Sequence, residues 1–368
     1  STPMKVYVHV PFCHSKCAYC DFYSVADRRR ADALVSAIKS EWEARSPEIG
    51  GHEAVRTIYI GGGTPSCLSA SQFACLADAL PYSRQIEEYT IEVNPEDVTP
   101  QSVKLWRGHG VNRISMGIQS FDDSELKAIN LRHNPDDALR AVETIRDGGI
   151  ENISCDIIYG LPGQSTASWR HTLDKLLSLG IPHFSAYCLS YEEGTLLFRR
   201  LQQGLINAAS DEVIAAMYDY LCEAAAGAGF EHYEIANFAR KGKRSVHNSN
   251  YWNATPYLGL GPGAHSCDTH GIRRFNPPDI RNYTDSTQPV CRIDEENETD
   301  RFNDLVITGL RTADGIRLDR VGNDRLDILL RDAAPYLSRD MLRLADGRLS
   351  IPEKHWLVSD SIIRDIMQ

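Results

Sequence analysis

Short apolar runs of the kind that form strands recur along the first half of the chain, and each is followed by a segment with helical periodicity. In these segments apolar residues recur about every four positions, as at Leu34, Ile38 and Trp42, which indicates helices that bury one face. Alternating strands and helices predict an α/β fold with parallel strands joined by right-handed crossovers. The pattern alone allows an open doubly wound sheet or a full or partial barrel. Six strands are predicted, over residues 5–10, 57–60, 89–93, 113–117, 152–158 and 183–189.

The pattern changes after the sixth predicted strand. A long helix is predicted over residues 211–228, followed by a segment rich in glycine and proline, 241–278, that reads as loop. Helical periodicity returns from about residue 292 and ends in a predicted terminal helix, 356–367. We therefore expect an α/β domain over residues 1–285, which includes the loop near 241–278, and a mostly helical domain over residues 286–368.

Distinctive motifs stand at or just after the predicted strands. The glycine-rich stretch GGGTP, residues 61–65, follows the second strand, Glu92 lies in the third, Gln119 follows the fourth and Asp156 lies late in the fifth. The carboxyl ends of parallel strands form the functional face of α/β folds. These motifs are therefore expected to converge on one site.

The stretch CHSKCAYC follows the first strand and holds Cys13, Cys17 and Cys20, three of the ten cysteines, within eight residues. Three thiolates leave one iron of a four-iron cluster open to another ligand. One alternative is a zinc site completed by His9 or His14. Another is a disulfide with one free thiol, which a reducing compartment disfavours. Zinc would account for none of the motifs at the other strand ends, so an iron–sulfur site is favoured.

This cysteine spacing resembles the radical S-adenosylmethionine (SAM) superfamily, in which SAM chelates the open iron. The stretches YVHVPFC, GGGTP, EVNPE, GIQSF and DIIYGLPG are similar to the branch related to coproporphyrinogen oxidase, which contains the HemN and HemW families. The resemblance runs from Tyr7 to about residue 270 and continues more weakly to the end. It implies a partial (βα)6 barrel with a C-terminal helical domain, a [4Fe–4S] cluster on Cys13, Cys17 and Cys20, and SAM on the fourth iron.

The resemblance also implies a set of SAM-binding residues. The family places an arginine about twelve residues after the glutamine, where this chain has Leu131 followed by Arg132, so a surface arginine is the alternative for Arg132. A strand-end carboxylate that caps the next loop is the alternative for Glu92 and Asp156, and a tight turn without a ligand is the alternative for GGGTP. The set is Tyr7, Tyr19, Gly62, Gly63, Thr64, Glu92, Gln119, Arg132 and Asp156.

Two features distinguish HemN-like from HemW-like sequences. Phe22 stands where HemN proteins have a fourth cysteine, and twelve residues precede Cys13, where HemN proteins have an N-terminal extension. HemW proteins instead carry Cys-Asp-Phe and a His-Asn-x-x-Tyr-Trp motif, and both occur here, the second at residues 247–252. HemW proteins are regarded as heme chaperones that deliver heme to hemoproteins. The resemblance thus implies a chaperone that does not decarboxylate coproporphyrinogen; a radical enzyme acting on a porphyrin is the alternative.

The same motif implies heme contacts at His247 and Trp252. A neutral imidazole is a common axial ligand of heme iron, and an indole offers flat apolar surface to a macrocycle. The alternative is a loop whose histidine bonds to the backbone while its aromatic residues pack on the barrel. His265 and His270 compete with His247 as the ligand.

Composition and charge limit the classes of molecule that the protein is expected to bind. The net charge of −11, with no basic stripe, argues against nucleic acid. No apolar run reaches the roughly 20 residues that a transmembrane helix needs, and the first ten residues lack the apolar core of a signal peptide. We expect a cytoplasmic protein whose partners are heme and client hemoproteins; an oligomer is compatible with the sequence.

Overall fold

The computed structural model describes residues 3–81, 84–252 and 255–368, without the side chains of residues 250 and 252. The chain forms two compact units. The first consists of Ser1–Met217 and Thr255–Asp294, and the second of Tyr218–Ala254 and Glu295–Gln368. The predicted domains, 1–285 and 286–368, differ from these units mainly in residues 218–254, which pack with the C-terminal helices.

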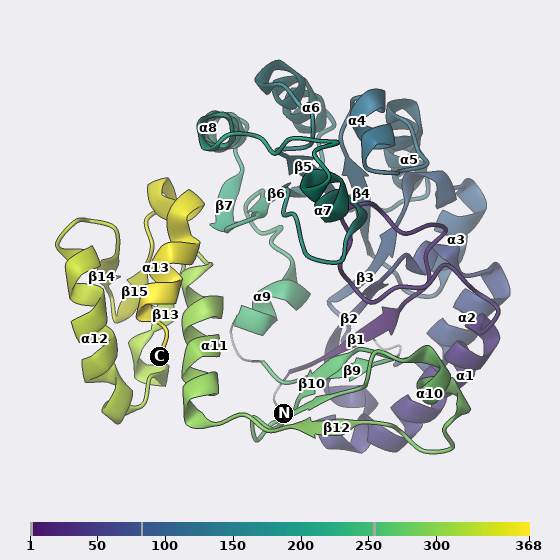
Figure 1. The fold of residues 1–368 in the computed structure, drawn as a ribbon. Helices are drawn as coiled ribbons and strands as arrows, with labels where there is room; N and C mark the ends of the chain where they lie inside the picture. Colours follow the sequence, from purple (N-terminus) through teal and green to yellow (C-terminus); the bar gives the residue numbers. More distant parts are fainter. Residues whose placement is uncertain (1–2, 82–83, 253–254) are drawn as a thin grey trace. The chain divides into compact units, whose positions relative to one another are not determined.

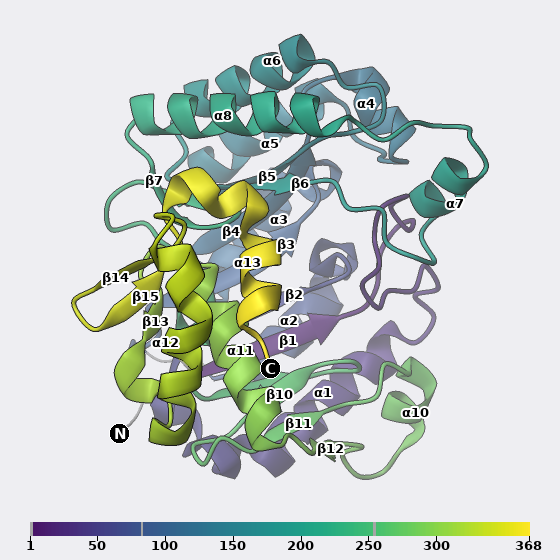
Figure 2. The ribbon, with the colours of Figure 1, turned by 60° about the vertical axis from the view of Figure 1, so that its left-hand side comes forward.

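The first unit is built on the parallel strands that the sequence predicts, and the prediction of an α/β barrel-type fold is confirmed. Neighbouring strands pair in register, with Tyr7 opposite Tyr59 and Thr90 opposite Arg113. Helices follow one another around the outside of the strands (Figure 1; Figure 2). The strands are β1 (Met4–Val10), β2 (Val55–Gly62), β3 (Glu88–Val93), β4 (Arg113–Gln119), β5 (Asn152–Tyr159) and β6 (His183–Cys188).

The helices of this unit begin at clear sequence signals. Thr99 and Asn134 each accept a hydrogen bond from the backbone three residues later and precede a proline in the first turn, which satisfies backbone donors that a helix start leaves free. The helices are α1 (Ala31–Arg45), α2 (Ala70–Ala79), α3 (Pro100–Gly108), α4 (Asp123–Ala128), α5 (Pro135–Asp147), α6 (Thr166–Ser178), α7 (Leu196–Gln202) and α10 (Ile280–Asp285).

The segment predicted as loop contains regular structure. β9 (Tyr257–Leu260) pairs in parallel with β1, and β10 (His265–Cys267), β11 (Arg273–Phe275) and β12 (Arg292–Asp294) extend the sheet as antiparallel strands. These strands have only three or four residues each and are separated by glycine and proline, so the sequence pattern does not reveal them.

A buried polar network joins this extension to α1. Glu41 is 2% exposed, and its carboxylate accepts hydrogen bonds from Gly261 N at 2.9 Å, from the Asn276 amide and from Tyr283 Oη. Arg45 pairs with the same carboxylate at 2.8 Å. A buried ion pair is stable only when further hydrogen bonds satisfy it, as they do here.

The second unit is mostly helical, which confirms the predicted C-terminal class. It holds the end of α8 (Asp211–Gly227), the hairpin β7 (Glu231–Glu234) and β8 (Asn237–Ala239), α9 (Val246–Trp252), α11 (Glu298–Leu310), α12 (Asn323–Leu337) and α13 (Ser359–Ile366). A small sheet is formed by β13 (Ile316–Arg317), β15 (Arg348–Ser350) and β14 (Arg343–Ala345), and the 3₁₀ helix η6 (Glu353–Val358) precedes α13.

Across the described ranges, no helix of either unit combines the length and the apolar character needed to cross a membrane.

Candidate functional site

A cavity of about 500 Å³ opens at the carboxyl ends of the parallel strands. Strands β1 to β6 all contribute to its wall, whereas the sequence predicts motifs only at the ends of β1 to β5. Of the nine residues that the sequence assigns to SAM, eight line it: Tyr7, Tyr19, Gly62, Gly63, Thr64, Glu92, Gln119 and Asp156. Cys17 and Cys20 line the same cavity, so the cysteine motif and the strand-end motifs meet in one place.

The three cysteines stand on the long loop between β1 and α1, and all three thiols are free. Backbone hydrogen bonds hold the loop: Cys13 N donates to Val25 O at 3.1 Å, and Ala18 N donates to Ile129 O at 3.1 Å. Burial, together with the neighbouring Cys20, raises the pKa of the Cys17 thiol to about 12. Because metals bind thiolates, binding of a metal here would displace protons from the loop.

The zinc alternative is not favoured by the histidines that would complete it. His9 Nε2 lies 3.1 Å from Tyr23 O, so this nitrogen carries the proton, and Nδ1 is left to accept the Tyr7 hydroxyl at 2.9 Å. His14 Nε2 lies 2.8 Å from Asp97 Oδ1. Both nitrogens of His9 and one nitrogen of His14 are thus already engaged.

The glycine loop lies directly against the start of the cysteine loop. Gly62 has φ +118°, and Gly63 has so little space that a Cβ atom would stand 2.5 Å from Phe12 O. Only residues without a side chain allow this approach. The alternative of a simple tight turn does not account for the contact with the residue that precedes Cys13.

Two half-buried carboxylates, Glu92 and Asp156, line the cavity near the buried Arg113. Tyr59 Oη donates to Glu92 Oε1 at 2.8 Å, and Gly62 N donates to Glu92 Oε2 at 3.2 Å. Burial raises the pKa of Glu92 to about 7 and that of Asp156 to about 6, while Arg113 opposes both shifts. Raised pKa values in a cavity are typical of binding and active sites.

Gln119 has a strained backbone and an unused polar atom. Its φ is +70°, Ser120 N donates to Ile118 O at 2.9 Å, and the register with β5 shifts at this point. Among the described residues, Gln119 Oε1 has no hydrogen-bond partner although it is buried. Strain of this kind persists where function requires the geometry. The site therefore fits an iron–sulfur cluster with a polar organic ligand: it offers three thiols, a glycine loop that lets a ligand approach, and this free amide oxygen.

Some residues lie elsewhere or were not anticipated. Arg132 is exposed and does not line the cavity, whereas its neighbour Leu131 packs against an apolar cluster, so the structure agrees with the surface alternative. Sequence reasoning considered His9 only as a zinc ligand and missed Tyr59 and Arg113. Their signal is a period of two: polar residues alternate along β1 to β4 and share the inner face of the barrel.

The histidines proposed for heme lie in different surroundings. His247 is buried in α9, a helix rather than a loop, and its Nε2 lies 3.1 Å from Tyr251 Oη. The side chain of Trp252 lies outside the described residues. His265, in β10, and His270, which follows that strand, are both exposed.

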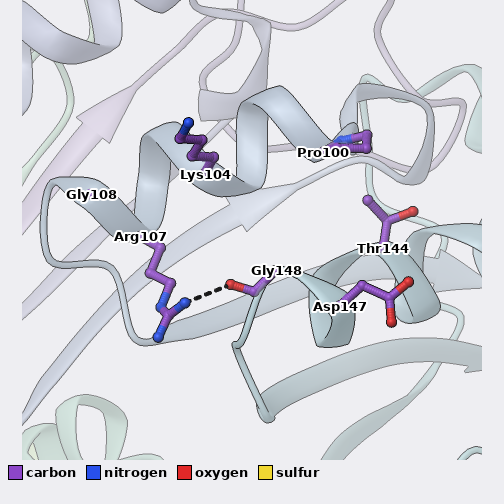
Figure 3. Close-up of a pocket in the computed structure, with 7 residues that line it drawn as sticks. All are labelled: Pro100, Lys104, Arg107, Gly108, Thr144, Asp147 and Gly148. Carbon is purple, nitrogen blue, oxygen red and sulfur yellow. Dashed lines mark hydrogen bonds between the residues drawn. The ribbon is translucent and has the colours of Figure 1, made fainter.

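A second hollow lies on the outer surface between α3 and α5 (Figure 3). Arg107 Nη1 donates to Gly148 O at 3.1 Å across it, and Lys104 and Asp147 are among the residues that line it. None of the cysteines line it, and its residues come from helices rather than strand ends. The cavity at the strand ends is therefore the candidate site.

Comparisons with known proteins agree with this assignment. The radical SAM superfamily matches residues 7–176. Heme chaperone HemW of Lactococcus lactis is 36% identical over 87% of this chain and 85% of that protein, and HemW of Bacillus subtilis is 33% identical over 86% and 85%. HemW of Mycobacterium tuberculosis is 30% identical over 99% and 95%.

Among solved structures, coproporphyrinogen III oxidase (HemN) from Escherichia coli matches 100% of this chain and 90% of its own, with a TM-score of 0.83 and 21% identity. At this identity the likeness concerns the fold. A radical SAM domain implies a [4Fe–4S] cluster and SAM. The chain belongs to the HemW family of the radical SAM superfamily.

Proposed function

We propose that the protein is a heme chaperone that carries a [4Fe–4S] cluster and SAM, binds heme and delivers it to hemoproteins. The observation that carries the proposal is the identity of 30–36% with proteins named heme chaperone over most of both chains. The sequence motifs Cys-Asp-Phe and His-Asn-x-x-Tyr-Trp belong to the same resemblance and support it.

Cys13, Cys17 and Cys20 would hold the cluster, whose open iron offers a site for SAM and whose redox chemistry supplies single electrons. Glu92 would accept hydrogen bonds from the ribose hydroxyls of SAM, and Gln119 Oε1 would accept one from a polar group of the same ligand. The glycine loop lets the ligand approach the backbone closely.

Phe22 supports a chaperone rather than a decarboxylase. Phe22, where HemN proteins have a fourth cysteine, is 68% exposed and lines the cavity together with Tyr187, which is 46% exposed. Two exposed aromatic rings at the site offer flat apolar surface to a macrocycle. They offer no thiol and no further base.

His247 is the proposed axial ligand of heme, with Trp252 packing against the ring. Because His247 is buried and its Nε2 contacts Tyr251 Oη, heme binding requires α9 to release this nitrogen. The His247 nitrogen would leave the Tyr251 hydroxyl when heme binds and return to it when heme is delivered, which suits a carrier. His265 and His270 are exposed and compete as ligands that need no rearrangement.

Heme titration of the reconstituted protein tests the proposal. We expect saturable binding with a Soret band that His247→Ala loses or shifts, while the iron content of the cluster is unchanged. Tyr251→Phe removes the competing hydroxyl, worth about 1 kcal/mol, and should tighten heme binding about fivefold. His265→Ala serves as the control. A spectrum that changes in His265→Ala and not in His247→Ala would transfer the ligand to β10, and absence of saturable binding would refute the chaperone.

The second candidate is a radical enzyme acting on a porphyrin. This candidate would use the same cavity, which eight of the nine implied SAM-binding residues line. A porphyrin substrate that is converted only in the presence of SAM would support this candidate.

A further inference from the structure

Outside the barrel, three side chains with metal-binding atoms meet in the second unit. Cys222 comes from α8, His232 from β7 and Glu353 from η6, and their ligand atoms all lie within 4.8 Å of one another. His232 Nδ1 lies 3.9 Å from Cys222 Sγ and 3.1 Å from Glu353 Oε1. We propose that these three residues form a zinc site, independent of the cluster and of heme.

The orientation of His232 is the first support. Its Nε2 lies 3.1 Å from Ile235 O, a pure acceptor, so this nitrogen carries a proton and Nδ1 is the nitrogen that faces the other two residues. Metal-binding histidines usually donate their second nitrogen to a carbonyl or carboxylate in this way. The ring is clamped by Phe238, stacked at 4.0 Å, and by Trp356, edge-on at 4.4 Å.

The spacing of the donors is the second support. Zinc binds sulfur at about 2.3 Å and nitrogen or oxygen at about 2.0–2.1 Å. At tetrahedral angles these lengths place sulfur about 3.6 Å from nitrogen, and nitrogen about 3.3 Å from oxygen. The observed 3.9 Å and 3.1 Å differ from these by a few tenths of an ångström. A thiolate, an imidazole and a carboxylate together suit zinc better than magnesium or calcium, which prefer oxygen alone.

A nucleophilic triad does not fit the same residues. In a cysteine–histidine–acid triad, the thiol and the carboxylate contact opposite nitrogens of the ring. Here both approach Nδ1, and Nε2 is occupied by Ile235 O. Burial also raises the pKa of the Cys222 thiol to about 12, which is the opposite of activation.

Binding would replace the thiol proton with the metal. Zn²⁺ takes the sulfur of Cys222 as thiolate, Nδ1 of neutral His232 and one carboxylate oxygen of Glu353, and one proton is released to solvent. The Glu353 side chain is 50% exposed, so water can supply the fourth ligand. Zinc would then tie α8, β7 and η6 together and stabilise the second unit.

The experiment uses anaerobic protein whose cluster is loaded, so that the cysteines of the barrel loop are occupied. Zinc X-ray absorption should show one sulfur and three nitrogen or oxygen ligands, at one zinc per chain. Competition with a chromophoric chelator should show that Cys222→Ser weakens zinc binding more than about 100-fold. Loss of a residue that only orients a metal ligand weakens binding by about 10- to 100-fold, so a larger loss indicates direct ligation. The matched control Cys75→Ser, at an exposed cysteine of α2, should bind zinc like the wild type.

Glu353→Gln provides a second variant at an exposed position, with an expected loss of about tenfold and no effect on the cluster. His232→Ala is avoided because the ring is packed between two aromatic residues. Wild-type zinc affinity in Cys222→Ser, or a zinc shell without sulfur in the wild type, would overturn the proposal. Neither result bears on heme binding, so the two proposals fail separately.

Discussion

Glu92→Gln separates the role of Glu92 in stability from its role in ligand binding. Burial raises the pKa of this carboxyl from 4.5 to about 7, so the folded state binds its proton more tightly than the unfolded chain does. The charged Glu92 therefore lowers the free energy of unfolding. This cost is absent below about pH 4.5, grows between pH 4.5 and pH 7, and is complete above pH 7. A tenfold change in proton affinity corresponds to about 1.4 kcal/mol, which gives an upper limit of roughly 3 kcal/mol.

The amide removes this cost but disturbs two hydrogen bonds. Its oxygen can accept from either Tyr59 Oη or Gly62 N, and its NH₂ group faces the other donor, at a cost of roughly 1–2 kcal/mol. Water in the cavity screens part of the charge and reduces the gain further. We therefore expect Glu92→Gln to be about 1 kcal/mol less stable than the wild type at pH 5 and equal or more stable at pH 8.

Urea unfolding of the protein without cofactors, at a series of pH values, measures this difference. Calorimetric titration of the cluster-loaded protein should show SAM binding weakened by about 1–3 kcal/mol, because a charge-assisted acceptor is lost. Glu43→Gln, at an exposed position of α1, is the control and should change neither quantity. A stability difference that does not vary with pH would refute the burial argument, and unchanged SAM affinity would remove Glu92 from the binding site.

Two further predictions concern the cluster and the core. Anaerobic reconstitution should yield about four irons per chain, and Cys17→Ala should abolish this uptake while Cys75→Ala leaves it intact; stoichiometric zinc in place of iron in the native protein would contradict the cluster. Glu41→Ala should lower the free energy of unfolding by about 3–5 kcal/mol in urea denaturation, since it removes the buried acceptor of Gly261 N and the Asn276 amide and leaves Arg45 with only Glu48 as a carboxylate partner; a loss below about 1 kcal/mol would show that water compensates the charge.

The sequence predicts the barrel well because its strands carry local signals. Each of the six runs from β1 to β6 is apolar enough to be recognised without knowledge of its neighbours, and the carboxyl ends of parallel strands necessarily share one edge. The convergence of Glu92, Gln119 and Asp156 follows from that rule alone. Which atoms are buried, strained or unpartnered, as at Gln119, depends on tertiary contacts that the pattern does not encode.

Other features escape the sequence because they are non-local or short. β9 has four residues and is held by pairing with β1, which lies about 250 residues earlier in the chain. Glu41 and Arg45 read as an ordinary surface pair at helical spacing, and only the contacts with Asn276 and Gly261 bury them. Arg132 illustrates a third limit, since a loop has no periodicity that would reveal that neither Leu131 nor Arg132 lines the cavity.

We propose that this member of a radical SAM family handles heme as cargo and does not decarboxylate a porphyrin precursor. One anaerobic assay tests it directly: reconstituted protein with SAM and a reductant is given heme and coproporphyrinogen in parallel, with heme binding followed by absorption and tetrapyrrole products by chromatography. We predict saturable heme binding near one per chain and no protoporphyrinogen. Robust formation of protoporphyrinogen, without saturable heme binding, would refute the chaperone proposal and establish the enzyme instead.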